Sequence, residues 1–282
     1  MTAPWSSIPE PTTADLGKAR PSHLKLHWGQ AETSAAHRFH SAHEQSQSES
    51  LHLAQFDETL EPYSLQWFLM LEAHRYGRRG RWLRELLEFS KHEGETVLGL
   101  GEGLGTDWLQ FARQGAQVIC CQNRTSDLAV VRRNFELRKL PARFYQAAPW
   151  NLPLPAESVD VVCLHGLLHR IEAPERVTTE ILRVLKPGGK VLAVVPARSY
   201  PWLRWLRTTP AAPRSLCFSR RQLCQLFPHF TDPMLHKRHL RRRDYRWFCR
   251  WIPRGFLERL IGDYFIFRAF KPISAGALRL AA

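Results

Sequence analysis

Three glycines in a short segment form the arrangement best suited to chemistry in this sequence. Gly101, Gly103 and Gly105 follow an apolar run at 97–100 and precede an amphipathic segment at 106–112. Glycine is needed where a backbone turns sharply or approaches a ligand closely, because a Cβ atom would collide there. A loop between a strand and a helix also presents free amide hydrogens to whatever lies beside it. The segment therefore predicts a site for a nucleotide-type cofactor.

The segments that must hold this loop alternate between strand-like and helix-like patterns. Strands are expected at 97–100, 116–121, 142–146, 159–164, 190–195 and, to close the sheet, 263–271, with helices at 126–139, 174–185 and 219–230. This rhythm predicts an α/β fold, a Rossmann-like, doubly wound and mostly parallel sheet with helices on both faces. Ligands of such sheets bind at the carboxyl ends of the strands, where the glycine loop lies.

Helical spacing before the loop predicts two further helices between 63 and 89, separated by a break at 77–80. In the first, Leu65, Phe68 and Leu69 are expected on the buried side and Glu72 on the outer side. This helix either covers the cofactor or packs against the sheet, and packing is the simpler interpretation.

Length and composition indicate a globular core. The 282 residues are 44% hydrophobic, and no apolar run is long enough to span a membrane. The start has no signal-peptide pattern, and the cysteines form no C-x-x-C pair, so we expect cysteines packed in a core and a reducing cytoplasm. The six cysteines are Cys120, Cys121, Cys163, Cys217, Cys224 and Cys249.

Residues 1–55 are rich in Pro, Ser, Gln and His, which predicts a disordered polar leader before a domain at 56–272 and a tail at 273–282. His37, His40 and His43 recur every three residues, a spacing compatible with metal ligation. No acid or cysteine completes a ligand set, so a polar leader is favoured and no metal site is assigned.

Three later motifs add specificity. They read LPLPAESVDVV at 152–162, LHGLLH at 164–169 and EILRVLKPGG at 180–189. In order and spacing, together with the glycine loop, they resemble class I S-adenosylmethionine-dependent methyltransferases of the type 11 group, which includes ubiquinone and menaquinone C-methyltransferases. The resemblance covers about residues 60–196. It implies S-adenosylmethionine as cofactor and methyl transfer to a small-molecule or lipid-like acceptor.

The resemblance also implies carboxylates that this chain lacks. The family's acids at the ends of its first and second strands and before its Leu-Pro motif correspond to Gly99, Gln122 and Ala148. A neutral hydrogen bond is weaker than a charge-assisted one, so the cofactor loses affinity at each position. The cofactor-binding set implied by the resemblance is Gly99, Gly101, Glu102, Gly103, Gly105, Gln122, Asn123, Ala148, Trp150 and His165.

Two interpretations of the core therefore stay open. In the first the chain is an active methyltransferase with an unusual pocket, in which Glu102 either replaces a missing carboxylate or repels the carboxylate of the cofactor. In the second it is a degenerate binding or scaffold module that no longer binds S-adenosylmethionine. His165 and His169 are candidate substrate-side residues, either as a general base or as structural loop histidines; no catalytic residue is assigned.

The net charge of +14 is concentrated near the C-terminus, because residues 198–254 contain 14 Arg and Lys against 2 acids. Basic residues alternate with aromatic ones in an insert at about 197–216 and 236–255. If its second half is helical, Arg242, Arg246 and Arg250 form one stripe and Trp247 and Trp251 the next. The segment 236–254 fits an anionic membrane surface, or RNA as the less favoured partner, or a solvated basic face.

Overall fold

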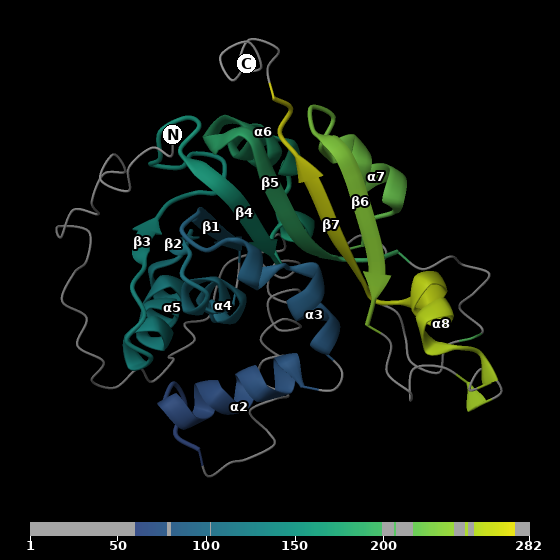
Figure 1. Ribbon diagram of the computed structural model, residues 1–282, viewed down its shortest axis with the longest axis horizontal. Helices are drawn as coiled ribbons and strands as arrows, with labels where there is room; N and C mark the ends of the chain where they lie inside the picture. Colours follow the sequence, from purple (N-terminus) through teal and green to yellow (C-terminus); the bar gives the residue numbers. More distant parts are fainter. Residues whose placement is uncertain are drawn as a thin grey trace, which may run out of the picture.

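The computed structural model describes residues 60–77, 80–101, 103–198, 206, 217–239, 246–247 and 251–273. Within them a single sheet has the strand order β3-β2-β1-β4-β5-β7-β6 (Figure 1). The strands from β3 to β5 in this order are parallel, and β7 is antiparallel to both of its neighbours. The strands are β1 (Thr96–Gly101), β2 (Gln117–Gln122), β3 (Arg143–Gln146), β4 (Val159–His165), β5 (Leu185–Pro196), β6 (Thr231–Arg238) and β7 (Tyr264–Phe270).

Helices cover both faces of the sheet, which confirms the predicted doubly wound, Rossmann-like architecture. Apolar side chains of α3 (Arg81–Leu86), α4 (Thr106–Arg113) and α5 (Thr125–Leu137) pack on one face. Those of α6 (Pro174–Val184) and α7 (Arg220–Leu226) pack on the other. Because side chains alternate along a strand, β1 directs Leu98 and Leu100 to the α6 face. Short 3-10 turns follow α3 and β4, at η3 (Phe89–Lys91) and η4 (Leu168–Arg170).

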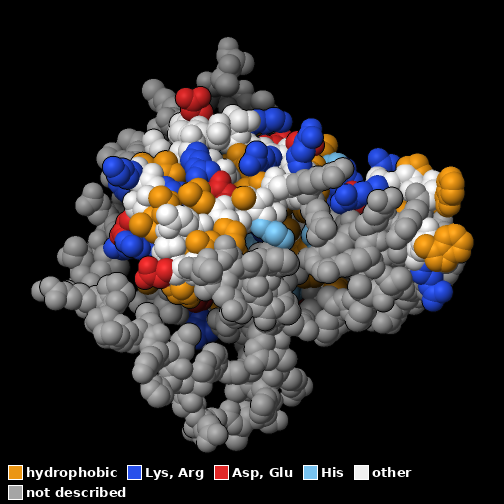
Figure 2. Space-filling view, turned by 90° about the horizontal axis from the view of Figure 1, so that it is seen from below, with side chains coloured by type: hydrophobic (Ala, Val, Ile, Leu, Met, Phe, Trp, Pro, Cys, Tyr) orange, Lys and Arg blue, Asp and Glu red, His pale blue; other side chains and the backbone are white. Residues whose placement is uncertain are grey.

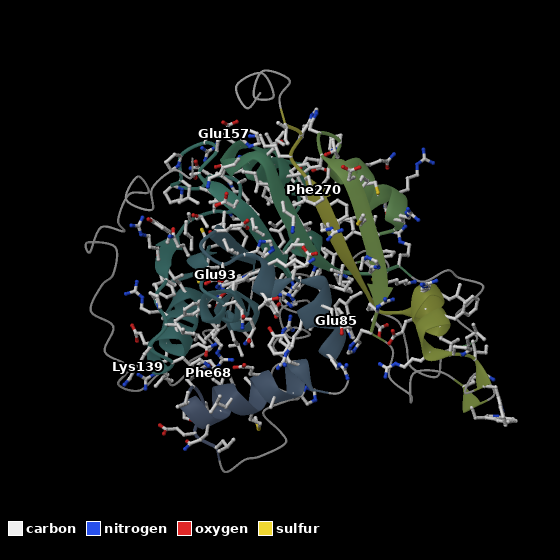
Figure 3. All side chains as sticks on the ribbon, viewed as in Figure 1. Phe68, Glu85, Glu93, Lys139, Glu157 and Phe270 are labelled. Atoms are coloured by element: carbon white, nitrogen blue, oxygen red, sulfur yellow. The ribbon has the colours of Figure 1, made fainter. Side chains whose placement is uncertain are left out.

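The carboxyl ends of the parallel strands form one edge of the sheet. Gly101 at the end of β1 pairs with His165 at the end of β4. Gln122 at the end of β2 pairs with Gln146 at the end of β3. In Figure 1 this edge is the lower one, where α2 (Leu65–Tyr76), α3 and α8 (Arg254–Ile261) lie. Glu157, just before β4, marks the opposite edge in Figure 3. The expected ligand edge is therefore bordered by three helices.

The first helix differs from the prediction at three positions. Ser64 caps α2 by accepting a hydrogen bond from the amide of Trp67. Phe68 is buried between α2 and α5 as expected (Figure 3), but Leu65 and Leu69 are exposed. Glu72, expected on the outer side, is buried.

The buried side of α2 carries Trp67, Phe68 and Leu71, and Glu72 is tolerated beside them because it is paired. Glu72 accepts hydrogen bonds from Arg113 and Gln110 of α4 and from Arg138 after α5, the last at 2.8 Å. Burial raises the pKa of Glu72, but these donors outweigh it and lower the pKa below its ordinary value. A paired carboxylate therefore takes the buried position that an apolar-spacing argument assigned to leucines.

The C-terminal region corrects the bounds of the predicted insert. Residues 236–238, assigned to a basic insert, complete β6, and residues 254–255 begin α8. β6 joins the sheet by antiparallel pairing with β7, and local composition does not reveal this long-range contact. Four predicted features lie wholly or mostly outside the described residues. They are most of the first half of the insert, Arg242 and Arg250 of the predicted arginine stripe, the tail from residue 274, and the whole leader with its histidines.

Two predictions about residue types can be checked within the described ranges. Cys120, Cys121, Cys163 and Cys217 are buried and Cys224 is partly buried, as core packing predicts, and Cys249 lies outside the described residues. None of the helices described is both long enough and apolar enough to cross a bilayer.

Candidate functional site

The glycine loop has the backbone of a ligand cradle. Gly101, Gly103 and Gly105 have φ angles of 135°, 129° and 68°, which residues with a Cβ rarely adopt. A Cβ on Gly101 would lie 2.0 Å from the carbonyl oxygen of His165, so glycine lets β1 and β4 meet at their ends. A Cβ on Gly103 would meet no atom of the described residues within 4 Å. The loop therefore leaves open space at Gly103; Glu102 lies outside the described residues.

Gly99 lacks an acid for a steric reason. Its Cβ would lie 2.4 Å from the indole of Trp108, the third residue of α4. Trp108 is 2% exposed and belongs to the core between the sheet and α4. The aromatic ring thus fills the place where the resemblance expects a carboxylate.

Gln122 holds the glycine loop from the end of β2. Its side chain is buried, and Nε2 donates a hydrogen bond to the carbonyl oxygen of Gly103 at 3.3 Å. A carboxylate could not make this bond, because it has no proton to donate. Its Oε1 accepts no hydrogen bond from the described residues, so it can serve as an acceptor for a ligand hydroxyl.

The remaining predicted cofactor residues lie further along the same edge. Asn123 is exposed after β2. Ala148 accepts a hydrogen bond from the amide of Asn151 in the turn after β3. Trp150 in that turn is 37% exposed, with the guanidinium of Arg176 at 5.6 Å from its ring centre. Among the described residues, no hydrogen bond joins Ala148 or Trp150 to the glycine loop, so the structure brings together Gly101, Gly103, Gln122 and His165.

A buried ionic cluster at the same edge was not predicted from the sequence. Arg75 of α2 donates from Nε to Asp107 Oδ1 at 2.6 Å and from Nη2 to Oδ2 at 2.5 Å. The hydroxyl of Tyr76 also donates to Asp107 Oδ1. His165 Nδ1 lies 3.2 Å from Arg75 Nη2 and 3.4 Å from Asp107 Oδ2. The cluster therefore connects the first helix, the turn after the glycine loop and the end of β4.

The charges of this cluster are mutually stabilised. Burial raises the pKa of Asp107, but the adjacent positive charge of Arg75 outweighs it and lowers that pKa to about 2. Burial, and then the repulsion of Arg75, lower the pKa of His165 to about 4. His165 is therefore neutral at physiological pH. Nδ1 of His165 can accept from Arg75 when Nε2 carries the proton, or donate to Asp107 when Nδ1 itself carries it. Nε2 of His165 therefore serves a ligand as donor in the first tautomer and as acceptor in the second.

His169, in η4, has a comparable state. Burial lowers its pKa to about 4, and its Nε2 lies 3.3 Å from the Nε of Arg170, which donates to it. The proton of the neutral ring is then on Nδ1, which is buried and meets no partner among the described residues. An unsatisfied buried donor is costly, and because this nitrogen has almost no accessible surface, a ligand oxygen would reach it only after its surroundings move.

These observations fit a cofactor. The described residues contain no cluster of three or more His, Cys, Asp or Glu that could hold a metal ion. A Cβ on Gly103 would meet no described atom within 4 Å, and Oε1 of Gln122 and the ring of His165 lie at the same edge of the sheet. The sequence did not identify Arg75, Tyr76 and Asp107 as site residues. One feature could have pointed to them, because Asp107 is an acid in the first turn of an otherwise buried helix.

Comparison with known proteins agrees with this geometry. Residues 97–193 match the family described as a methyltransferase domain, Methyltransf_11. A demethylmenaquinone methyltransferase of Streptomyces avermitilis is 29% identical over 138 residues, which are 49% of this chain and 56% of that protein. The ubiquinone/menaquinone biosynthesis C-methyltransferase UbiE of Azotobacter vinelandii is 30% identical over 156 residues, or 53% of this chain and 62% of that protein. The chain thus spans less than two thirds of the length of either relative.

A solved structure supports the fold. A SAM-dependent methyltransferase from Aquifex aeolicus is similar to 74% of this chain and 98% of its own, with a TM-score of 0.54 and 15% identity. The match over residues 97–193 includes the glycine loop, both missing-acid positions on the strands, and His165. The resemblance of this chain to class I S-adenosylmethionine-dependent methyltransferases of the type 11 group is thereby confirmed.

Proposed function

We propose that this chain is an S-adenosylmethionine-dependent methyltransferase that acts on a small, lipid-like acceptor of the quinone type. The observation that carries the proposal is the loop from β1 to α4, in which a Cβ on Gly103 would meet no described atom within 4 Å and Gln122 bonds to the Gly103 carbonyl. The curated relatives named for demethylmenaquinone and ubiquinone/menaquinone methylation support the choice of acceptor.

Residues at the strand ends would hold the cofactor. The backbone amides of the glycine loop would donate to the cofactor, and Oε1 of Gln122 would accept a hydrogen bond from a ribose hydroxyl. Asn123, Ala148 and Trp150 follow β2 and β3, on the side where the adenine ring of the cofactor would bind. S-adenosylmethionine supplies an electrophilic methyl group bonded to a sulfonium.

The histidines would act on the acceptor as hydrogen-bond donors rather than as bases. Arg170 donates to His169 Nε2, and Arg75 lies within donating distance of His165 Nδ1. In the tautomers that accept these bonds, the other nitrogen of each ring carries a proton. Such donors can bind an acceptor oxygen and orient its neighbouring carbon. Positioning of this kind contributes most of the rate when a methyl group is transferred in line. The acceptor proton would leave to solvent, so the proposal favours acceptors with an acidic, electron-rich ring.

A degenerate, non-binding domain is the alternative, favoured by the three missing carboxylates. Loss of one charge-assisted contact costs about 1–3 kcal/mol, or roughly 5- to 150-fold in affinity. The Trp108 ring excludes an acid at Gly99 altogether. In this alternative the same fold serves as a binding or scaffold module.

Calorimetry with the full chain distinguishes the two functions. We expect S-adenosylmethionine and S-adenosylhomocysteine to bind, and label from methyl-tritiated S-adenosylmethionine to appear in a reduced demethylmenaquinone analogue. Absence of heat with both ligands at millimolar concentration would establish the scaffold alternative. Binding without transfer would retain the cofactor and reject the quinone-type acceptor.

A further inference from the structure

Large apolar side chains protrude from the molecule around the start of α8. Trp247, Trp251, Ile252 and Phe256, which we call the aromatic patch, are 73%, 89%, 37% and 56% exposed. Exposure of this extent is unusual for tryptophan, whose burial contributes strongly to folding. In Figure 2, hydrophobic side chains with Lys and Arg beside them protrude at the right end, the side on which Figure 1 shows α8.

The aromatic patch stands on a fixed base. Leu257 and Ile261 on the inner side of α8 are fully buried. The ammonium group of Lys237 in β6 donates a hydrogen bond to the carbonyl oxygen of Leu260 at 2.8 Å, which ties the end of α8 to the sheet. Phe256, next to Leu257 in the helix, points away from this base, so it is available to a partner.

The charge around the patch is strongly positive. Among the described residues of 238–259, Arg238, Arg246, Arg254 and Arg259 are basic, and Glu258 is the one acid. Glu258 is already bonded to Arg254 at 2.9 Å. Arg246 and Arg259 are exposed. A partner that covers the patch must therefore be anionic at its surface and apolar beneath it.

The patch lies at the ligand edge of the sheet. Tyr264, which follows α8 after two residues, pairs with Pro196 at the carboxyl end of β5 and with Arg238 at the end of β6. The glycine loop and His165 lie at the same edge, at the ends of β1 and β4. A surface bound by the patch would consequently face the same direction as the candidate site.

We propose that the aromatic patch, together with Arg246, Arg254 and Arg259, binds the surface of an anionic lipid bilayer. Tryptophan and phenylalanine insert at the boundary between headgroups and acyl chains, and arginines bind the lipid phosphates. Ile252 favours lipid over RNA, because an aliphatic side chain gains by leaving water but gives no stacking surface to a base. The inference does not depend on methyl transfer.

Flotation of the full chain with lipid vesicles tests the proposal. We expect flotation with vesicles of phosphatidylcholine and phosphatidylglycerol, little flotation with phosphatidylcholine alone, and loss of binding as salt is raised. Equal flotation with both vesicle types, or none with either, would overturn the proposal. Salt-sensitive retention on single-stranded RNA without flotation would assign the surface to nucleic acid instead.

Matched variants locate the contact. Replacement of Trp247 and Trp251 by Ala should abolish most of the flotation, and R246E/R259E should weaken it roughly fivefold per charge. The control is Ile273→Ala, an exposed apolar residue after β7 at the opposite edge of the sheet, which should float like the parent chain. Unchanged circular dichroism keeps the result interpretable, and equal loss in the control would refute the assignment to α8.

Discussion

The guanidinium of Arg75 and the carboxylate of Asp107 form two hydrogen bonds, Nε to Oδ1 at 2.6 Å and Nη2 to Oδ2 at 2.5 Å. This pair joins α2 to the first turn of α4, which follows the glycine loop directly. Asp107 is 5% exposed, so its charge depends on Arg75 for compensation. The loop that could hold the cofactor is therefore braced from outside the sheet.

Asp107→Asn should destabilise the protein strongly. The amide would present a donor to one nitrogen of Arg75 and leave a buried charge without compensation, which costs about 3–5 kcal/mol. Urea unfolding followed by circular dichroism measures the loss. The control is Glu157→Gln, because Glu157 forms an ion pair with Lys271 at 3.1 Å but is exposed. This control should cost less than about 1 kcal/mol. Equal losses would show that the buried pair has no special role.

Removal of both partners provides an independent check on the same pair. The double variant R75M/D107L leaves no unpaired charge, so its loss of unfolding free energy should be smaller than the sum of the two single losses. Additive losses would contradict direct coupling between α2 and α4.

Acid should weaken the fold before any carboxylate of the cluster titrates. The pKa of His165 is lowered to about 4 in the folded protein by burial and by Arg75, while an unfolded histidine has a pKa near 6.5. The unfolded chain binds a proton that the folded chain does not, so stability falls as pH drops from about 6.5 towards 4. Asp107, with a pKa lowered to about 2, stays ionised throughout this window.

Unfolding in urea at pH 7, 6 and 5 measures this effect. By pH 5 we expect the free energy of unfolding to fall by about 1–2 kcal/mol per histidine. This value is discounted for solvent screening, because 30% of the His165 side chain is exposed. His165→Gln should remove its share of the pH dependence. An imidazole resonance of His165 that titrates between pH 6 and 7 would contradict the assignment of a neutral ring.

The sheet and its ligand edge were predictable from local patterns, because glycine spacing and strand-helix alternation act within a few residues. The glycine loop, Gln122 and His165 meet where the predicted strands end. The cluster of Arg75 and Asp107 was not predictable, because its members are separated by 32 positions and come together only through tertiary packing. Glu72 was misassigned for the same reason, since its donors Arg113 and Arg138 are remote in sequence.

The missing acid at Gly99 also became intelligible only in three dimensions. A carboxylate on Gly99 would collide with the indole of Trp108. Gly99→Asp should therefore lower the melting temperature sharply, because overpacking and an unpaired buried charge act together. Trp108→Ala should also destabilise, by about 3–5 kcal/mol through the cavity it leaves.

The double variant G99D/W108A tests whether the two residues share one space. Because the shortened side chain makes room for the carboxylate, its loss of stability should be smaller than the sum of the single losses. If the family's acid also strengthens the cofactor site, calorimetry should show higher affinity for S-adenosylmethionine in the double variant than in W108A. Additive destabilisation would show that the Trp108 ring is not the reason for glycine at this position.

Gln122 offers the most direct test of the cofactor site, because the structure provides its own control. Gln122→Ala removes the hydrogen bond to the carbonyl of Gly103 and the free acceptor Oε1, so affinity for S-adenosylmethionine should fall roughly 5- to 150-fold. The control is Gln146→Ala, because Gln146 on β3 is paired in register with Gln122. The side chain of Gln146 is exposed and, among the described residues, is bonded only to Thr125. This control should bind like the parent chain. Equal affinity in Q122A and Q146A would exclude Gln122 from the site, whereas a specific loss in Q122A would show that Gln122 contributes to cofactor binding, as a ligand or by holding the glycine loop.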